Sequence, residues 1–209
     1  MAANETQNIP FIEEGNKGFD VYTLNNDNTY AAGVHIGGMV SLSATITAES
    51  VNLPADDDPT YYSFEKPITI DGTATFRKMT VADYKAMYAN ITDGNEVVTF
   101  GRRGMAKQVG FAFNNTRVYK DGTTAEQRIC FLNARFSLPP IETQTIEEDS
   151  DTVRPFAIPF KAYTYNYTSK DGKSDRAAIT MPNSKENADI WDKVKDKIYI
   201  PDMEVTDLI

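Results

Sequence analysis

Two segments of the chain alternate between apolar and polar residues, and this period of two constrains the fold more than any other feature. Residues 40–47 place Val, Leu, Ala and Ile at even positions and Ser or Thr at odd positions. Residues 68–77 repeat the pattern, with Asp71-Gly72 inside it. Successive side chains of a strand point to opposite faces, so each segment predicts a strand with one apolar and one wet face.

These two strands are expected to pair with each other, with Gly72 forming a bulge or bend. The residues expected to be buried within the subunit are Val40, Leu42, Ile46, Ile68, Ile70 and Phe76.

Further strands are predicted at residues 96–100, 108–114, 128–138 and 154–167, because Asx-Gly and Asn-Asn turns separate runs rich in Val, Ile, Thr, Phe and Tyr. The acidic stretch 147–151 between the last two strands is interpreted as a solvated hairpin tip. The fold class is therefore mainly β, a β-sandwich or barrel-like subunit with one short packed helix and a C-terminal helix.

The first helix is predicted over residues 81–89. Thr80 can cap it and Asp83 takes the matching capping-box position, with Val81, Tyr84 and Tyr88 on one face. A second helix is predicted after Asn183 and Glu186, with Pro201 ending it. Its apolar stripe is Ile190, Trp191, Val194 and Ile198.

The charge balance excludes one large class of function. The chain has 209 residues with 30 Asp and Glu against 21 Lys and Arg, a formal net charge of -9. Such an acidic chain repels phosphate, so a sequence-reading DNA-binding domain is disfavoured. The start of the chain does not look like a signal peptide and no stretch approaches the apolar length of a membrane span, so we expect synthesis in a cytoplasm and no membrane contact.

No catalytic constellation is evident, and we expect neither an enzyme nor a bound cofactor or metal. His35 is the single histidine and Cys130 the single cysteine; a packed or surface histidine and a buried inert thiol are the expected readings. The run Asp56-Asp57-Asp58 lacks the ligand spacing of a calcium loop. Tyr163, Tyr165 and Tyr167 alternate, and a packed sheet face is favoured over a sugar-stacking face.

The segment between the two alternating strands, residues 48–67, is interpreted as a long loop with a function of its own. It contains Pro54, the three aspartates and several aromatic residues, which contribute most when buried against a partner.

The order of these segments resembles the major tail tube proteins of siphophages, the bacteriophages with long non-contractile tails. The resemblance covers residues 18–167: the Ser/Thr strand, the acidic loop, the second strand, the short helix, the run Phe131-Leu132-Asn133-Ala134-Arg135-Phe136-Ser137 and the run 156–162. The second helix and the tail after it fall outside the pattern.

The resemblance implies a structural virion protein of the tail, made in the bacterial host, whose hexameric rings stack into a tube that conducts DNA during ejection. Its implied partners are other copies of itself, the tape measure protein, the tail terminator and the distal tail proteins, with DNA only in transit and without sequence-specific binding. The acidic charge suggests a channel wall that repels DNA. The implied organisation is an N-terminal arm at 1–17, a β domain at 18–180 with an inter-ring loop at 48–67, and a C-terminal helix and tail at 181–209.

The resemblance also assigns two sets of residues. The lumen-facing set is Ser41, Ser43, Thr45, Thr47, Thr69, Asp71, Thr73 and Thr75. The inter-ring loop set is Asp56, Asp57, Asp58, Tyr61, Tyr62 and Phe64. Two alternatives stay open: a carbohydrate- or cell-wall-binding β-sandwich module with a concave aromatic site, and a hydrolase without a nominated catalytic pair.

Overall fold

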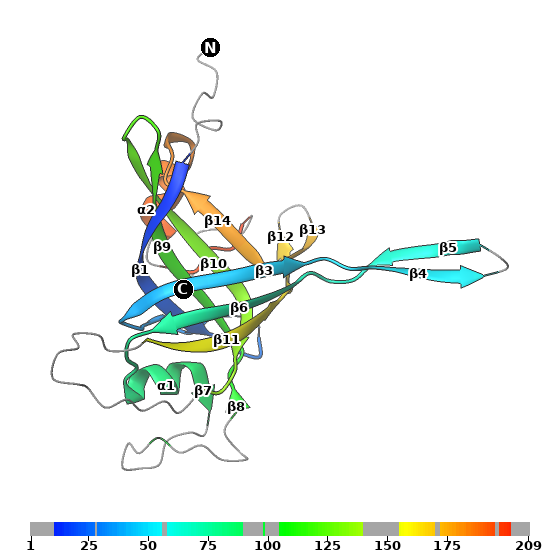
Figure 1. Cartoon of the computed structure of the whole chain (residues 1–209), viewed down its shortest axis with the longest axis horizontal. Coiled ribbons are helices and arrows are strands. Elements are labelled where there is room, and N and C mark those ends of the chain that lie inside the picture. Colours follow the sequence, from blue (N-terminus) through cyan, green and yellow to red (C-terminus); the bar gives the residue numbers. More distant parts are fainter. Residues whose placement is uncertain are drawn as a thin grey trace.

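The computed structural model describes residues 11–27, 29–55, 58–89, 98, 105–139, 155–169, 172–194 and 197–201, and Figure 1 shows their arrangement. The chain is mainly β and largely antiparallel, which confirms the predicted fold class. Its strands are β1 (Phe11–Thr23), β2 (Val34–His35), β3 (Met39–Thr47), β4 (Ser50–Ala55), β5 (Asp58–Glu65), β6 (Thr69–Phe76), β7 (Tyr88–Ala89), β8 (Met105–Ala106), β9 (Val109–Tyr119), β10 (Thr124–Phe136), β11 (Phe156–Tyr163), β12 (Tyr165–Ser169), β13 (Gly172–Arg176) and β14 (Ala178–Pro182). Its helices are α1 (Val81–Met87), the 3-10 turn η2 (Lys185–Asn187) and α2 (Ala188–Val194).

One eight-stranded sheet organises the molecule, in the order β2-β1-β9-β10-β11-β6-β3 with β14 also paired to β10. β10 belongs to both halves of this sheet. Its first part pairs with β9 and β14, whereas Ala134–Phe136 pair with β11. The sheet therefore divides into a β1-β9-β10 half and a β11-β6-β3 half.

The main core is a cluster of phenyl rings between the two halves. Phe111 of β9 stacks on Phe131 of β10 with ring centroids 4.6 Å apart, and it meets Phe160 of β11 edge-on at 5.1 Å. Phe19 of β1 contacts Phe76 of β6 at 5.3 Å. These five side chains are all buried, so the sheet closes over them in the manner of a sandwich.

The two alternating segments form β3 and β6, which pair antiparallel as expected. Gly72 is not a bulge, because the register runs unbroken through Ala44 and Gly72, and the shift lies between Met39 and Ser41 instead. A Cβ at Gly72 would lie against the Phe160 ring and 2.7 Å from the carbonyl oxygen of Ser43. Close approach of the neighbouring strands, and not a bend, therefore explains the glycine.

The first helix begins as predicted. The Thr80 side chain accepts a hydrogen bond from the backbone N–H of Asp83, and the Asp83 carboxylate accepts one from the N–H of Thr80 at 2.6 Å. The helix ends at Met87, since Tyr88 already has extended backbone and begins β7. The Tyr88 hydroxyl then donates to the Ser137 carbonyl at 2.6 Å, which ties this end of the helix to the residue that follows β10.

The second helix is shorter than predicted. α2 ends at Val194, and residues 197–200 are not helical, so Ile198 is not part of a helical stripe. Trp191, Val194 and Ile198 are nevertheless buried together against the outer face of the β1-β9-β10 half. The apolar pattern indicated burial correctly but not the conformation that achieves it.

Both expected domain boundaries cut through strands. β1 starts at Phe11, inside the expected N-terminal arm, and pairs with β9 along residues 11–23. Gly15 and Gly18, at φ of 60° and 62°, accompany two register shifts that interrupt its alternation and hide it from pattern analysis. At the other boundary, Met181 and Pro182 belong to β14, which pairs with β10. Residues 1–10 and 202–209 lie outside the described part.

Three strand predictions also need adjustment. β9 and β10 extend beyond the predicted limits toward a turn at residues 120–123. The single strand predicted at 154–167 is divided at Thr164 into β11 and β12. The strand predicted at 96–100 lies outside the described residues apart from Val98, and so does the acidic tip at 147–151.

Candidate assembly surfaces

All eight residues assigned to the lumen lie on one face of the β3–β6 ribbon. They form four directly opposed pairs: Ser41 with Thr75, Ser43 with Thr73, Thr45 with Asp71, and Thr47 with Thr69. Opposed residues of paired strands point to the same face. The alternation therefore yields a continuous hydroxyl-rich surface, hereafter the polar face.

The polar face continues onto β11, which the sequence analysis did not assign. Register places Ala157, Pro159, Lys161 and Tyr163 opposite Thr75, Thr73, Asp71 and Thr69. All four β11 residues are exposed, whereas the residues between them are buried or half-buried. The sequence of β11 alternates in the same way, with its buried residues at even-numbered positions. The sequence analysis used this alternation only to predict a longer strand at 154–167.

The charged residues of the polar face lie in one row across the sheet. Lys161 is opposite Asp71 on one side and Arg135 on the other. Its ammonium group is 3.3 Å from the Asp71 carboxylate, while Arg135 is exposed and makes no hydrogen bond or ion pair within the described part of the chain. One carboxylate and two cations do not make an acidic wall, so the negative charge of the chain is carried by other surfaces.

The apolar side of β3 is only partly covered within the subunit, contrary to expectation: Leu42 is half-buried and packs against the main core, but its neighbours on that side are exposed. Ile70 and Phe76 of β6 are buried, but Val40 and Ile46 of β3 are 40% and 65% exposed, and Ile68 is exposed as well. Among the described residues no strand pairs with the outer side of β3. From Ser41 to Thr47 the pattern correctly gave the face of each side chain, but none of the described residues covers the outer part of that face.

The two ends of the main sheet are protected differently. β1 carries register shifts at Gly15 and Gly18 along its edge, and the short strand β2 covers part of it. β3 has no charged residue, proline or glycine, and its register is regular from Ser41 to Thr47. Bulges, charges and prolines are the usual defences of an edge strand, so β3 is an edge left open to pairing.

Residues 48–67 are not an irregular loop; they form the hairpin β4–β5, which extends away from the body of the molecule (Figure 1). Val51 pairs with Phe64 and Leu53 with Tyr62, so these four residues share one face. The hairpin pattern was missed because Pro54 and Pro59 interrupt it. Of the predicted loop residues, Asp56 and Asp57 lie outside the described part, and Asp58 begins β5.

The hairpin exposes aromatic side chains on both of its faces. Tyr62 is 58% exposed and Phe64 is also exposed, with their rings 6.1 Å apart, while Tyr61 on the opposite face is 68% exposed. At its base the Lys66 ammonium donates to the Glu49 carboxylate at 2.7 Å, and the Lys66 N–H donates to the Glu49 carbonyl. The side-chain hydrogen bond from the Lys66 ammonium lowers the pKa of the Glu49 carboxylate below its usual value. No described residue covers the apolar surface of the hairpin, as is typical of an interaction surface.

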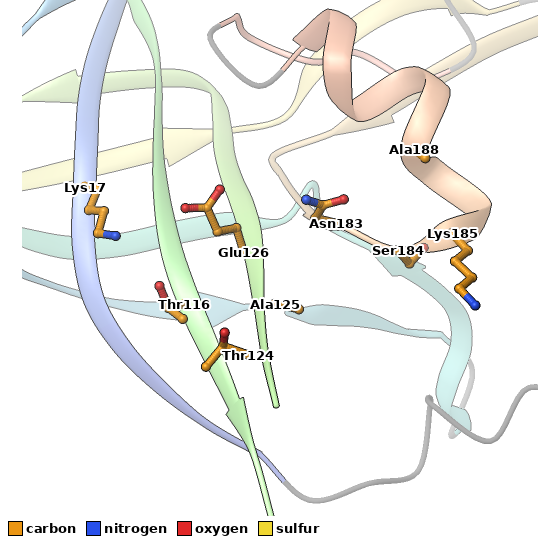
Figure 2. Close-up of a pocket in the computed structure, with 9 residues that line it drawn as sticks. All are labelled: Lys17, Thr116, Thr124, Ala125, Glu126, Asn183, Ser184, Lys185 and Ala188. Carbon is orange, nitrogen blue, oxygen red and sulfur yellow. The ribbon is translucent and has the colours of Figure 1, made fainter. Parts of the chain in front are cut away.

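A groove lies between strands β1, β9 and β10 on one side and residues 183–188 on the other (Figure 2). Its volume is about 590 Å³, and its lining is Lys17, Thr116, Thr124, Ala125, Glu126, Asn183, Ser184, Lys185 and Ala188. None of these lining residues is aromatic. The sugar-binding site considered from the sequence depends on stacking against aromatic rings, so this groove does not fit it. Tyr165 and Tyr167 instead pack in a buried cluster that also contains Trp191 and Val194, as the sequence analysis favoured, and of the three tyrosines only Tyr163 is exposed.

Arg128 fixes the C-terminal segment on this outer side. Its guanidinium is buried and donates to the Lys197 carbonyl at 2.6 Å, the Asn114 side-chain oxygen at 3.0 Å and the Tyr22 hydroxyl at 3.0 Å. It also lies 3.5 Å from the Asp20 carboxylate. Burial raises the pKa of the Tyr22 hydroxyl, so the network holds a neutral phenol beside a paired arginine.

The two residues considered for catalysis occupy the expected environments. His35 is a largely exposed side chain whose Nδ1 lies 3.0 Å from Asp20, and Cys130 is buried, which raises the pKa of its thiol. Within the described ranges, no group of three or more His, Cys, Asp or Glu side chains is placed to hold a metal ion. No helix in those ranges is long and apolar enough to cross a membrane.

Neither the protein-family models nor the curated proteins contain a match to this chain. The fold and its surfaces therefore define the class of protein at the level of a mainly β chain with an open sheet edge and a projecting hairpin.

Proposed function

We propose that this chain is the repeating subunit of a siphophage tail tube, a structural protein of the virion through which DNA passes during ejection. The observation that carries the proposal is the β3–β6 ribbon. It combines an open edge, a hydroxyl-rich face and an apolar hairpin that continues the same two strands. Each of these features is exposed in the single chain and becomes useful only in an assembly.

The open edge supports lateral assembly. A neighbouring copy that pairs with β3 would satisfy its free backbone groups and cover Val40 and Ile46. Repetition of this pairing around a ring closes the sheet into a barrel, which removes the edge altogether. In a hexameric ring the polar face would then line the channel, where Ser and Thr hydroxyls offer DNA few strong contacts.

The hairpin supports stacking of rings. Its strands pair with each other and with no other strand in the described part of the chain, so it is free to reach another ring. The tape measure protein, the tail terminator and the distal tail proteins are the further partners proposed for such a tube.

Electron microscopy of the concentrated protein under negative stain tests the proposal. Rings or tubes with a central channel are the expected result. Uniform particles of single-chain size at every concentration would contradict it.

A further inference from the structure

A row of charged side chains crosses the polar face from strand to strand. Register places Arg135 of β10 opposite Lys161 of β11, and Lys161 opposite Asp71 of β6. Opposed side chains of paired strands have their Cβ atoms about 4.5–5.5 Å apart, so the three groups are direct neighbours. All three residues are exposed. The row therefore presents two cations and one carboxylate to whatever passes over this face.

The carboxylates near the row are placed to neutralise Lys161, not Arg135. The Lys161 ammonium is 3.3 Å from the Asp71 carboxylate. It also attracts the Glu49 carboxylate, whose pKa is lowered first by the hydrogen bond from Lys66 and further by the charge of Lys161. Arg135 lies on the side of Lys161 away from Asp71, and no ion pair joins it to a carboxylate of the described residues. Like charges directly opposite each other are unfavourable, so this guanidinium has a repulsive neighbour.

The surroundings of Arg135 suit a phosphate group. Its guanidinium is a planar fork of N–H donors that matches phosphate oxygens better than an ammonium does. Ser137 is exposed, and its backbone N–H donates to the Pro159 carbonyl at 2.8 Å, which extends the pairing past the end of β10 and keeps Ser137 on the same face as Arg135. Its hydroxyl is a second donor beside the guanidinium, and Pro159 and Thr73 in the neighbouring row carry no charge.

We propose that Arg135 contacts the phosphate backbone of DNA, with the Ser137 hydroxyl and Lys161 beside it. The inference rests on the proposed function and names the residue of the polar face that touches the DNA. A row across the strands of a barrel runs around its axis, so a ring of subunits would present one such guanidinium per copy at the same level. A single arginine contact is weakened by salt and exchanges readily. It would guide moving DNA without holding it.

Nuclear magnetic resonance of the single folded chain tests the contact without relying on tubes. Inorganic phosphate and a short DNA duplex should each shift the amide resonances of residues 135, 137 and 161, and Arg135→Gln should abolish these shifts. Asp71→Asn should have the opposite effect and strengthen the response, because it frees Lys161. The control Lys120→Gln changes an exposed lysine elsewhere and should respond like wild type. Equal shifts with an oligoglutamate peptide would mean a site for acidic protein segments and overturn the assignment to DNA.

The segment that joins β10 to β11, residues 140–154, lies outside the described residues and needs its own control. Its carboxylates are Glu142, Glu147, Glu148, Asp149 and Asp151. A variant with Gln or Asn at all of these positions should respond to phosphate like wild type. A response that appears only in this variant would mean that the segment already neutralises Arg135, and it would overturn the contact.

The contact and the tube function can fail separately. Tubes from a wild type whose polar face shows no response to phosphate would overturn the contact alone. A wild type that never forms rings or tubes overturns the tube function, and the resonance shifts then decide the phosphate contact independently. In assembled particles Arg135→Gln should speed DNA ejection at low salt and Asp71→Asn should slow it, with both differences shrinking as salt rises.

Discussion

The ammonium group of Lys161 on β11 lies 3.3 Å from the carboxylate of Asp71 on β6, in the middle of the polar face. This pair leaves the face close to neutral, with Arg135 as the additional charge beside it. In a DNA channel lined by this face, added positive charge should therefore slow the passage of DNA strongly.

Substituting both Thr45→Lys and Thr73→Lys should preserve the fold and slow DNA ejection from assembled particles. Both residues are on the polar face, and the new lysines would hold phosphate in passing, so the defect should weaken as salt rises. Ejection kinetics at low and high ionic strength measure this effect. The isosteric control is Thr45→Gln with Thr73→Gln, and equal ejection by both variants at low salt would mean that this face does not meet DNA.

Replacing residues 52–63 by Asn-Gly should give a stable subunit that does not form tubes. Val51 and Phe64 are paired, so a two-residue turn can close the shortened hairpin. The change in stability should be small, because loop-closure entropy varies slowly with length. Circular dichroism checks the fold and microscopy the assembly; normal tubes from the shortened protein would remove the stacking role.

The Gly72→Ala variant should lower the free energy of unfolding by about 1–3 kcal/mol, the usual cost of overpacking. The new methyl group would press on the Phe160 ring and on the carbonyl of Ser43, and a backbone atom cannot move aside cheaply. Urea unfolding measures the loss. Gly37→Ala is the matched control, since a Cβ there has no neighbour within 4 Å, and an equal loss in both variants would contradict the packing argument.

The Arg128→Ala variant should lose about 3–5 kcal/mol of stability, as expected when one partner of a buried charged network is removed. Asn114, Tyr22, Asp20 and the Lys197 carbonyl would all lose their donor. Arg135→Ala removes an exposed arginine and should change stability by less than about 0.5 kcal/mol. Chemical denaturation of both variants makes the comparison, and hydrogen exchange should show the C-terminal segment loosening first in Arg128→Ala.

The base of the hairpin should weaken in acid. The hydrogen bond and charge of Lys66 lower the pKa of Glu49 from 4.5 in the folded chain. A lowered folded pKa means that the contribution is present above 4.5 and is lost as the pH falls through the folded value. The protection factors of the amides of residues 49 and 66, which are the exchange rates corrected for the intrinsic pH dependence of amide exchange, measure this loss against pH, and Lys66→Gln should remove the acid-dependent change in protection.

The sequence predicted the parts of the fold that local patterns determine. The β3–β6 pair, its two faces and the Thr80–Asp83 capping box follow from periodicity and cap chemistry. The exposure of Val40 and Ile46 could not be predicted, because alternation gives the face of a residue but not what covers it. β1 was hidden by glycines at bulges and the hairpin by prolines, while the role of Arg128 was hidden because its partners, Tyr22, Asn114 and Lys197, are far away in the sequence.

The near-continuity of β3 with β4 and of β5 with β6 has a mechanical consequence. Only Ala48 and Glu49 separate the first two strands, and Lys66, Pro67 and Ile68 the second two. A pull on the hairpin along its length would draw β3 and β6 in the same direction, so the load falls in shear on the β6–β11 ladder, whose hydrogen bonds would resist together instead of opening one after another. Tension between successive copies would thus be transmitted through backbone and ladder into the phenylalanine core, without passing through a flexible joint of many residues.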